Sequence, residues 1–260
     1  MRILFLGDIV GKPGRRAVGR FLPRLIDVEN LALVISNCEN VTDGAGVDPG
    51  AAQELMDSGI DVLTSGNHVW RRKEIIEFIQ TEPRLVRPAN FPPGAPGAGW
   101  TVAETADGVP IAVLNLIGRV FMDSVDCPFR TAEALLPELT RRARAIVVDM
   151  HCEATSEKGA MGWFLAGRVA AVLGSHTHVQ TADERVLPGG TAFISDAGMC
   201  GPLDSVIGVD KEAAIRRFIT QMPAKFDVAR GPAMVQGVVV DIDPESGRAL
   251  SIRRIRELEQ

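Results

Sequence analysis

The residues best suited to chemistry in this chain are its histidines and a set of acids and amides that recur in one position. Each closely follows a short apolar run, which is where a buried strand would end. The chain has four histidines, and all of them occupy such positions: His68, His151, His176 and His178. The carboxylates and carboxamides that share the position are Asp8, Glu39, Asn40 and Asn67. Scattered structural histidines would not sort in this way, so the pattern predicts a metal site.

The donor atoms of this set are imidazole nitrogens and carboxylate or carboxamide oxygens, without a thiolate pair. Such a mixture suits manganese, iron or zinc and is poor for copper(I) or an iron–sulfur cluster; magnesium also accepts oxygen donors. The set contains more donors than one tetrahedral ion can use. Two divalent ions about 3.5–4 Å apart, sharing a bridging carboxylate, would use them and would promote in-line attack at phosphorus.

The apolar runs are short, continuous and rich in Val, Ile and Leu, which is typical of strands buried on both faces. They lie at residues 3–6, 31–35, 62–63, 111–116, 146–148, 169–173, 192–194 and 235–242. Helical patterns separate several of them, at residues 15–27, 50–58, 72–80, 131–142 and 211–219. This alternation predicts an α/β protein with a largely parallel sheet, whose carboxyl-end edge would gather the candidate ligands.

The part of the chain after about residue 181 carries more strand and less helix. A sandwich of two sheets flanked by helices accommodates both parts better than one doubly wound sheet. The Pro- and Gly-rich stretch at residues 88–99 is expected to be a long loop or crossover rather than a linker. We therefore expect a single domain over residues 1–260.

Composition excludes several classes of protein. Hydrophobic residues make up 46% of the chain and charged residues 23%, as in an ordinary globular protein and unlike a disordered one. The net charge of −5 and the dispersed Lys and Arg argue against a strong nucleic-acid-binding surface. No run approaches the ~20 apolar residues that cross a membrane. Four cysteines without a CxxC pair favour a reducing, cytoplasmic location, and the sequence leaves a homo-oligomer open.

The order of these motifs resembles that of the calcineurin-like metallophosphoesterases. The series is Gly7-Asp8, Glu39-Asn40, Gly66-Asn67-His68, His151 and Gly174-Ser175-His176-Thr177-His178. The stretches at residues 149–158, 175–183 and 198–202 resemble, more closely, the YmdB-like branch of small bacterial phosphodiesterases that act on cyclic nucleotides. The likeness extends from Ile3 to about Val209. It implies a four-layer α/β/β/α fold, a sandwich of two mixed sheets flanked by helices.

The resemblance also implies a role for each candidate residue. The first metal ion would be bound by Asp8 and His178, the second by Asn67, His151 and His176, and Glu39 would bridge the two. The expected ions are iron or manganese, with zinc or magnesium as alternatives. His68 would act at the scissile phosphate as an acid or hydrogen-bond donor.

Two positions depart from the wider superfamily. Val10 stands where the superfamily has a ligand histidine, and we expect Asn40 to supply the missing donor. Val69 stands where an acidic residue commonly follows the Asn-His pair, so the sequence does not identify the acidic partner of His68.

The leading interpretation is a phosphodiesterase that hydrolyses cyclic nucleotides through a metal-bound hydroxide, with 2′,3′-cyclic nucleotides as the expected substrates by resemblance. A phosphomonoesterase, or a metal-bound regulator that binds RNA, a nucleotide or a protein with little turnover, stays open. Residues 118–122 and 128–130 could form a lid or an ordinary packed crossover. Thr155, Ser156 and Lys158 could line the pocket or cap the next helix.

Overall fold

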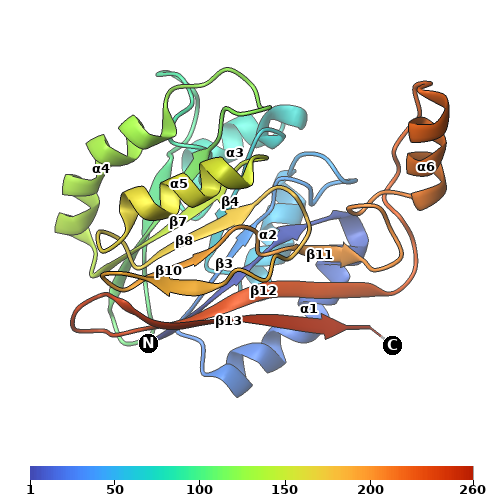
Figure 1. Cartoon of the computed structure of the whole chain (residues 1–260). Coiled ribbons are helices and arrows are strands. Elements are labelled where there is room, and N and C mark those ends of the chain that lie inside the picture. Colours follow the sequence, from blue (N-terminus) through green and yellow to red (C-terminus); the bar gives the residue numbers. More distant parts are fainter. Residues whose placement is uncertain (260) are drawn as a thin grey trace.

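The computed structural model describes residues 1–259 and contains two β-sheets packed face to face between two layers of helices (Figure 1). The helices are α1 (Gly11–Glu29), α2 (Pro49–Asp57), α3 (Ile75–Thr81), α4 (Pro128–Arg142), α5 (Thr155–Leu165) and α6 (Lys211–Thr220), with a 3-10 turn η1 at Val69–Arg71. The first three helices flank one sheet, and α4 and α5 flank the other. The four-layer α/β/β/α sandwich expected from the sequence is confirmed.

The first sheet has the strand order β2-β11-β12-β1-β3-β4, with β13 on the free side of β12. Its strands are β1 (Arg2–Leu6), β2 (Asp8–Ile9), β3 (Leu33–Asn37), β4 (Val62–Thr64), β11 (Met199–Pro202), β12 (Ala233–Ile242) and β13 (Ala249–Leu258). Strands β1, β3 and β4 run parallel, and β12 joins β1 in the antiparallel direction. The sheet is therefore mixed, as expected.

The second sheet has the order β5-β6-β7-β8-β10-β9. Its strands are β5 (Trp100–Glu104), β6 (Pro110–Ile117), β7 (Ala145–His151), β8 (Ala171–Ser175), β9 (Arg185–Leu187) and β10 (Thr191–Ile194). The four central strands run parallel, and β5 and β9 form antiparallel edges. Parallel neighbours end at the same edge of a sheet, so residues that follow β6, β7 and β8 come together in space.

Burial on both faces explains the continuous apolar runs. Along β1, Ile3 and Phe5 pack in the core between the two sheets, whereas Leu4 and Leu6 pack in the core that includes α1 and α2. Side chains of a strand alternate between its faces, so a strand that is covered on both sides needs an apolar residue at every position.

The sequence patterns did not predict β2, β5, β9, β11, β13 and α5, of which α5 and β13 are the longest. Helix α5 buries charged residues, Glu157 and Lys158, so it lacks a polar face that would mark it as amphipathic. Strand β13 carries the charged residues Arg253, Arg254, Arg256 and Glu257 on both sides of the buried Ile255, so no continuous apolar run marks it. The strand predicted at residues 169–173 begins two residues later in the structure, where β8 starts at Ala171.

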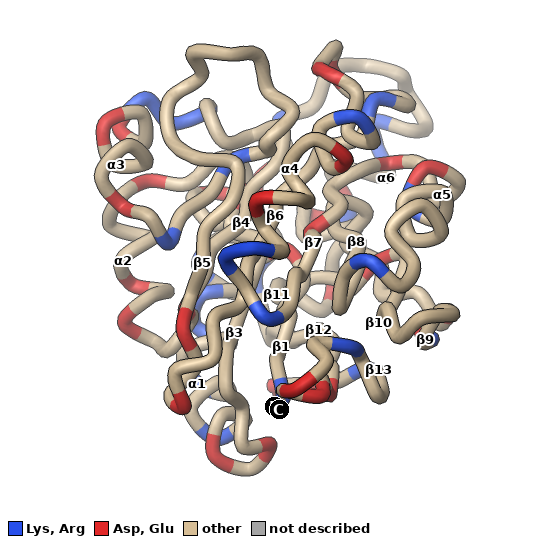
Figure 2. Tube along the Cα trace, turned by 90° about the vertical axis from the view of Figure 1, so that its left-hand side faces the viewer, with Lys and Arg blue, Asp and Glu red and all other residues tan. Residues whose placement is uncertain are grey.

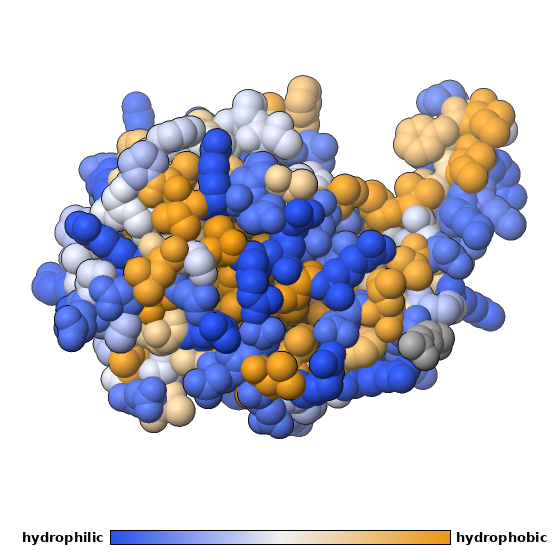
Figure 3. All heavy atoms as spheres, turned by 60° about the horizontal axis from the view of Figure 1, so that its bottom comes forward, coloured by the Kyte–Doolittle hydropathy of each residue, from blue (hydrophilic) through white to orange (hydrophobic). Residues whose placement is uncertain are grey.

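Basic and acidic residues are interspersed along the helices and strands that Figure 2 shows. Among the helices in residues 1–259, none combines the length and the apolar character that a bilayer crossing requires. Helix α6 projects from the sandwich (Figure 1), and the protruding lobe carries apolar side chains on its surface (Figure 3). Two of these, Phe218 and Ile219, are more than half exposed.

Candidate metal centre

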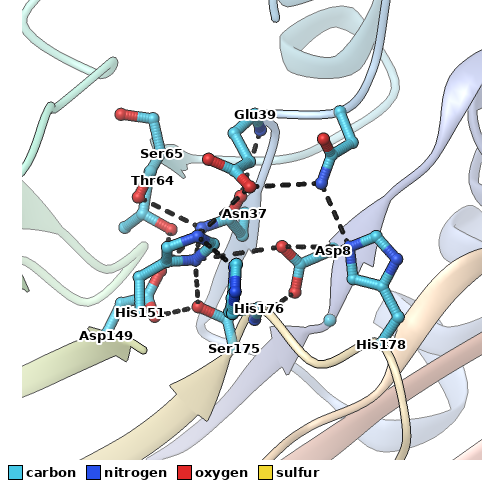
Figure 4. Close-up of polar contacts among 12 residues, drawn as sticks. Asp8, Asn37, Glu39, Thr64, Ser65, Asp149, His151, Ser175, His176 and His178 are labelled. Atoms are coloured by element: carbon cyan, nitrogen blue, oxygen red, sulfur yellow. Dashed lines mark hydrogen bonds and ion pairs between the residues drawn. The ribbon is translucent and has the colours of Figure 1, made fainter. Parts of the chain in front are cut away.

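The predicted site residues meet where strands of the two sheets end. Figure 4 shows five of them together: Asp8, Glu39, His151, His176 and His178. Asp8 begins β2, Glu39 and Asn40 follow β3, and Asn67 and His68 follow β4. From the second sheet, His151 ends β7, while His176 and His178 follow β8. Contacts join all eight side chains into one cluster, so the structure brings the predicted residues together.

One half of the cluster is centred on the Nε2 atom of His151. This nitrogen lies 3.1 Å from Glu39 Oε1, 3.2 Å from Asn67 Oδ1 and 3.1 Å from His176 Nδ1. Donor atoms of Glu39, His151 and His176 all lie within 4.8 Å of one another. Carboxylate and imidazole donors at this spacing are able to hold a divalent metal ion.

The other half of the cluster lies around His178. Its Nε2 atom is 3.7 Å from Asp8 Oδ1 and 3.1 Å from Asn40 Nδ2, and the same amide group lies 3.3 Å from Glu39 Oε1. Within residues 1–259, Asp8 Oδ1 is a buried oxygen without a hydrogen-bond partner. A buried carboxylate oxygen without a donor is costly, and a cation in this half of the site would satisfy it.

The segment between the two histidines of the second sheet has an unusual backbone. His176 and His178 have φ values of 98° and 64°, which non-glycine residues adopt rarely and mostly at functional sites. The main chain is fixed by side chains of the first sheet and of the β10–β11 connection. His176 N–H donates to Asp8 Oδ2 at 3.0 Å, and Thr177 N–H donates to Asp196 Oδ2 at 3.0 Å.

Gly66 is required for the close packing of the site. A Cβ atom at this position would lie 2.2 Å from His151 Nε2 and 2.4 Å from Glu39 Oε2. Any side chain would therefore displace both donors. Although Gly66 belongs to the sequence motif, its role could be recognised only once His151 was placed against it.

A buried relay, which the sequence did not reveal, orients His151. The Ser175 hydroxyl donates to Asp149 Oδ1 at 2.6 Å. Its oxygen atom, Oγ, therefore accepts a hydrogen bond from His151 Nδ1 at 2.9 Å. Because Nδ1 carries the proton, the lone pair of Nε2 is free to bind a metal ion. The other carboxylate oxygen of Asp149 accepts from Asn37 and Thr64. The only sequence signal for this relay is polar residues within otherwise apolar strands.

Without a metal ion, the ionisable groups of the site perturb one another strongly. Burial raises the pKa of Asp8 to about 6 and lowers the pKa of His176 to about 3. Burial would also lower the pKa of His151, but Glu39, Asp8 and Asp149 raise it to about 9. The pKa of Glu39 falls despite its burial, because His151 and His68 stabilise the carboxylate. Perturbed pKa values of this kind cluster at functional sites.

His68 is held by both neighbours on the β3 loop. Its Nδ1 atom lies 2.8 Å from Asn40 Oδ1 and 3.6 Å from Glu39 Oε1, and its main-chain N–H donates to Glu39 Oε2. Burial lowers the pKa of His68. Glu39 is thus the acidic group beside His68, which the sequence could not identify.

A cavity of about 540 Å³ opens at the cluster and is lined in part by Glu39, Asn40, His68, His176 and His178. Neither segment considered as a lid contributes to this lining. The ring of Phe129 packs on that of Phe164, with 5.5 Å between centroids, so the packed-crossover interpretation holds there.

Thr155, Ser156 and Lys158, which were considered as part of the pocket wall near His151, do not line the cavity. Lys158 forms a buried ion pair with Asp196 instead of reaching the cavity. Thr155 and Ser156 lie in the first turn of α5, and neither occupies its N-cap position, which is Ala154. Both proposed uses of these three residues are therefore wrong.

Residues 4–255 match the family model described as YmdB-like protein. The chain belongs to the YmdB-like protein family. It is 49% identical over 255 residues to a Bacillus subtilis protein named 2′,3′-cyclic-nucleotide 2′-phosphodiesterase, covering 98% of this chain and 96% of the relative. The resemblance inferred from the motifs is confirmed.

Two solved structures that are similar to this YmdB-like chain support the same kind of fold. A crystal structure described as a novel phosphatase from Mycoplasma pneumoniae is 34% identical, with a TM-score of 0.93, and the match covers 99% of this chain and 93% of the other. The calcineurin-like phosphoesterase YfkN from Bacillus subtilis is only 11% identical, with a TM-score of 0.54 over 99% of this chain and 90% of the other. That likeness concerns the fold alone, which is the calcineurin-like phosphoesterase fold.

Proposed function

We propose that this chain is a two-metal phosphodiesterase that hydrolyses cyclic nucleotides, with 2′,3′-cyclic nucleotides as its substrates. The observation that carries the proposal is the position of Glu39 between the two halves of the cluster. Its Oε1 atom lies 3.1 Å from His151 Nε2 on one side and 3.3 Å from Asn40 Nδ2 on the other. A carboxylate between two groups of candidate ligand residues could bridge two metal ions, and two-metal sites suit in-line displacement at phosphorus.

The donor atoms divide into two ligand sets. Asp8, Asn40 and His178 would hold one ion, Asn67, His151 and His176 the other, and Glu39 both. The unpartnered Asp8 Oδ1 atom supports this assignment, because it needs a cation. Iron or manganese suits the mixed set best, and zinc and magnesium remain candidates. When bound, the ions would lower the pKa of a water molecule and neutralise charge at phosphorus.

His68 is the proposed proton donor to the leaving oxygen. The hydrogen bond between its Nδ1 and Asn40 fixes the ring, and the side chain lines the cavity. A histidine held in this way can transfer a proton to an oxygen as the bond to phosphorus breaks. Opening of a cyclic diester breaks one P–O bond and yields a monoester, so His68 would give its proton to the departing ribose oxygen, which becomes a hydroxyl group.

A comparison of three substrates tests the proposal. Metal-loaded protein is assayed with 2′,3′-cyclic AMP, bis(p-nitrophenyl) phosphate and p-nitrophenyl phosphate. We expect hydrolysis of both diesters, with the highest kcat/KM for the cyclic nucleotide. The B. subtilis relative named as a 2′,3′-cyclic-nucleotide phosphodiesterase supports this order.

A phosphomonoesterase is the second candidate, which the M. pneumoniae structure described as a phosphatase favours. The same assay separates the two, because a monoesterase would prefer p-nitrophenyl phosphate. Tight nucleotide binding without hydrolysis of any of the three esters would contradict both and indicate a binding protein.

A further inference from the structure

One part of the cavity wall is a group of four apolar side chains, which lies beside polar side chains of the metal centre. We call this part the 207–228 wall; it consists of the side chains Ile207, Val209, Phe226 and Val228. All four come from the connection between β11 and β12, which also carries α6 (Figure 1). None of these four residues takes part in the proposed reaction at phosphorus.

The base of the 207–228 wall is held by main-chain bridges and by the packing of Val228 on the body of the protein. Val209 forms antiparallel bridges with Val206 and Val228, which close the base of the connection. Val228 fits against glycines, because a Cβ atom on Gly44 would lie 2.8 Å from its Cγ2. Val209 and Val228 are therefore fixed in place at the base of the wall, and α6 projects beyond it.

One hydrogen bond ties this wall to the metal centre. His178 donates from Nδ1 to the carbonyl oxygen of Ile207 at 2.8 Å, while its Nε2 faces Asp8 and Asn40. A single imidazole ring thus separates the proposed ligand atoms from the start of the apolar surface. Ile207 has a φ of 49°, an unfavourable conformation for a β-branched residue, of the kind that persists mainly at functional sites.

The two largest side chains of the wall are open to the cavity. Ile207 is 51% exposed and Phe226 is 45% exposed. Within residues 1–259, no other aromatic ring and no Arg or Lys side chain stacks on Phe226. An aromatic face and a branched aliphatic side chain, left exposed beside a phosphate-ester site, offer a surface to a flat apolar group.

We infer that the 207–228 wall is a nucleobase subsite, in which Phe226 and Ile207 contact the face of the base. The inference rests on the proposed phosphodiesterase activity and deepens it. A phosphate at the metal centre would leave the nucleoside within the same cavity, whose volume of about 540 Å³ lies in the range of sites for small molecules. Bases stack on aromatic side chains whatever their sequence identity, since every base has a π-face.

The chemistry of the wall also limits its selectivity. Its side chains carry no hydrogen-bond donor or acceptor, so they cannot read the edge of a base. Besides Glu39, two carboxylates line the same cavity, but Asp43 is engaged by Arg72 at 3.0 Å, and Glu153 Oε2 lies 3.2 Å from His176 Nε2. The subsite therefore favours nucleotides over base-free esters while discriminating weakly among the four bases.

The test compares 2′,3′-cyclic AMP with methyl ribofuranoside 2,3-cyclic phosphate, which has the same reacting group without a base. In the wild type, the base should lower KM. Phe226→Ala should raise KM for cyclic AMP roughly tenfold, as loss of one stacking contact does, and leave KM for the base-free ester unchanged. Phe226→Tyr should restore the wild-type value. Phe218→Ala, at an exposed phenylalanine of the same connection outside the cavity, is the matched control.

A binding measurement checks the inference apart from turnover. Calorimetry with adenosine 3′-monophosphate should show weaker binding to Phe226→Ala than to the wild type and the Phe218→Ala control. Equal KM values for the two cyclic esters in the wild type would overturn the subsite and leave the phosphodiesterase in place. A wild type that hydrolyses neither ester would overturn the proposed function, and the subsite with it.

Discussion

Lys158 and Asp196 form an ion pair in the interior, with 2.8 Å between Nζ and Oδ2, and each side chain is only 1% exposed. The pair joins α5 to the connection after β10. The same Asp196 carboxylate accepts N–H groups from Thr177 and Gly198, so it also fixes the main chain between His176 and His178. The geometry of two proposed metal ligands thus depends on a charge pair outside the cavity.

Removal of Lys158 should destabilise the protein strongly. Lys158→Met leaves the buried Asp196 carboxylate without its cation, which should lower the free energy of unfolding by about 3–5 kcal/mol. Lys225→Met removes a lysine that pairs with Asp227 at the surface and should leave the urea midpoint unchanged. Equal midpoints for the two variants would show that the buried pair contributes no stability.

The relay through Ser175 should govern metal affinity. Ser175→Ala removes the acceptor of the His151 Nδ1 proton, which should weaken metal binding about 10–100-fold. Thr64→Val is the matched control, because Thr64 also donates to Asp149 but does not contact His151. Metal titration at fixed pH checks the difference. An equal loss of affinity in both variants would show that Asp149, and not the link to His151, determines the effect.

His68 should matter for turnover and not for metal binding. His68→Ala should lower kcat by roughly 10²–10⁴-fold, because the leaving oxygen loses its proton donor. Metal content by elemental analysis should equal that of the wild type, since His68 is outside both proposed ligand sets. Loss of metal from the variant would contradict the assigned role.

Asp48 should make stability depend on pH. It caps α2 by accepting from Ala51 N–H at 2.9 Å, and the Thr42 hydroxyl donates to it at 2.7 Å. Burial opposes the charge, but these hydrogen bonds lower the pKa of Asp48 below its ordinary value of about 3.9. A depressed native pKa stabilises the fold above pH ~3.9, and the contribution disappears as pH falls through the native pKa.

Asp48→Ala should therefore lower the free energy of unfolding by about 1 kcal/mol at neutral pH, and the difference should shrink below about pH 4. Asp57→Ala, at the far end of the same helix, should change the free energy of unfolding by less than about 0.5 kcal/mol. Urea titrations between pH 3 and 7 measure both. A difference for Asp48→Ala that stays constant over this range would refute the hydrogen-bonded carboxylate as its source.

Much of the fold could be predicted because burial leaves a direct trace in the sequence. The run from Ile3 to Leu6 is apolar throughout, since one half of it packs between the sheets and the other half beneath the helices. Helix α5 gives no such trace. Its buried Lys158 and Glu157 are satisfied by partners far away in the chain, Asp196 and the main chain at Arg119.

The site was predictable for a similar reason. Parallel strands end at one edge, so polar residues that follow several of them must meet there. The partners that orient these residues were not predictable, because they are set by three-dimensional contacts. Asn37 and Asp149 are 112 residues apart and bond through side chains of adjacent sheets. The 207–228 wall likewise consists of ordinary apolar residues, and only its place beside His178 distinguishes it.

Metal content, measured together with hydrolysis of 2′,3′-cyclic AMP in the wild type and in Glu39→Ala, would show whether Glu39 bridges two ions that the reaction needs. We expect about two ions per chain in the wild type, as in two-metal esterases, and loss of both activity and one ion in the variant. A wild type that takes up no metal, or a variant that keeps its full metal content and its activity, would refute the bridged two-metal centre.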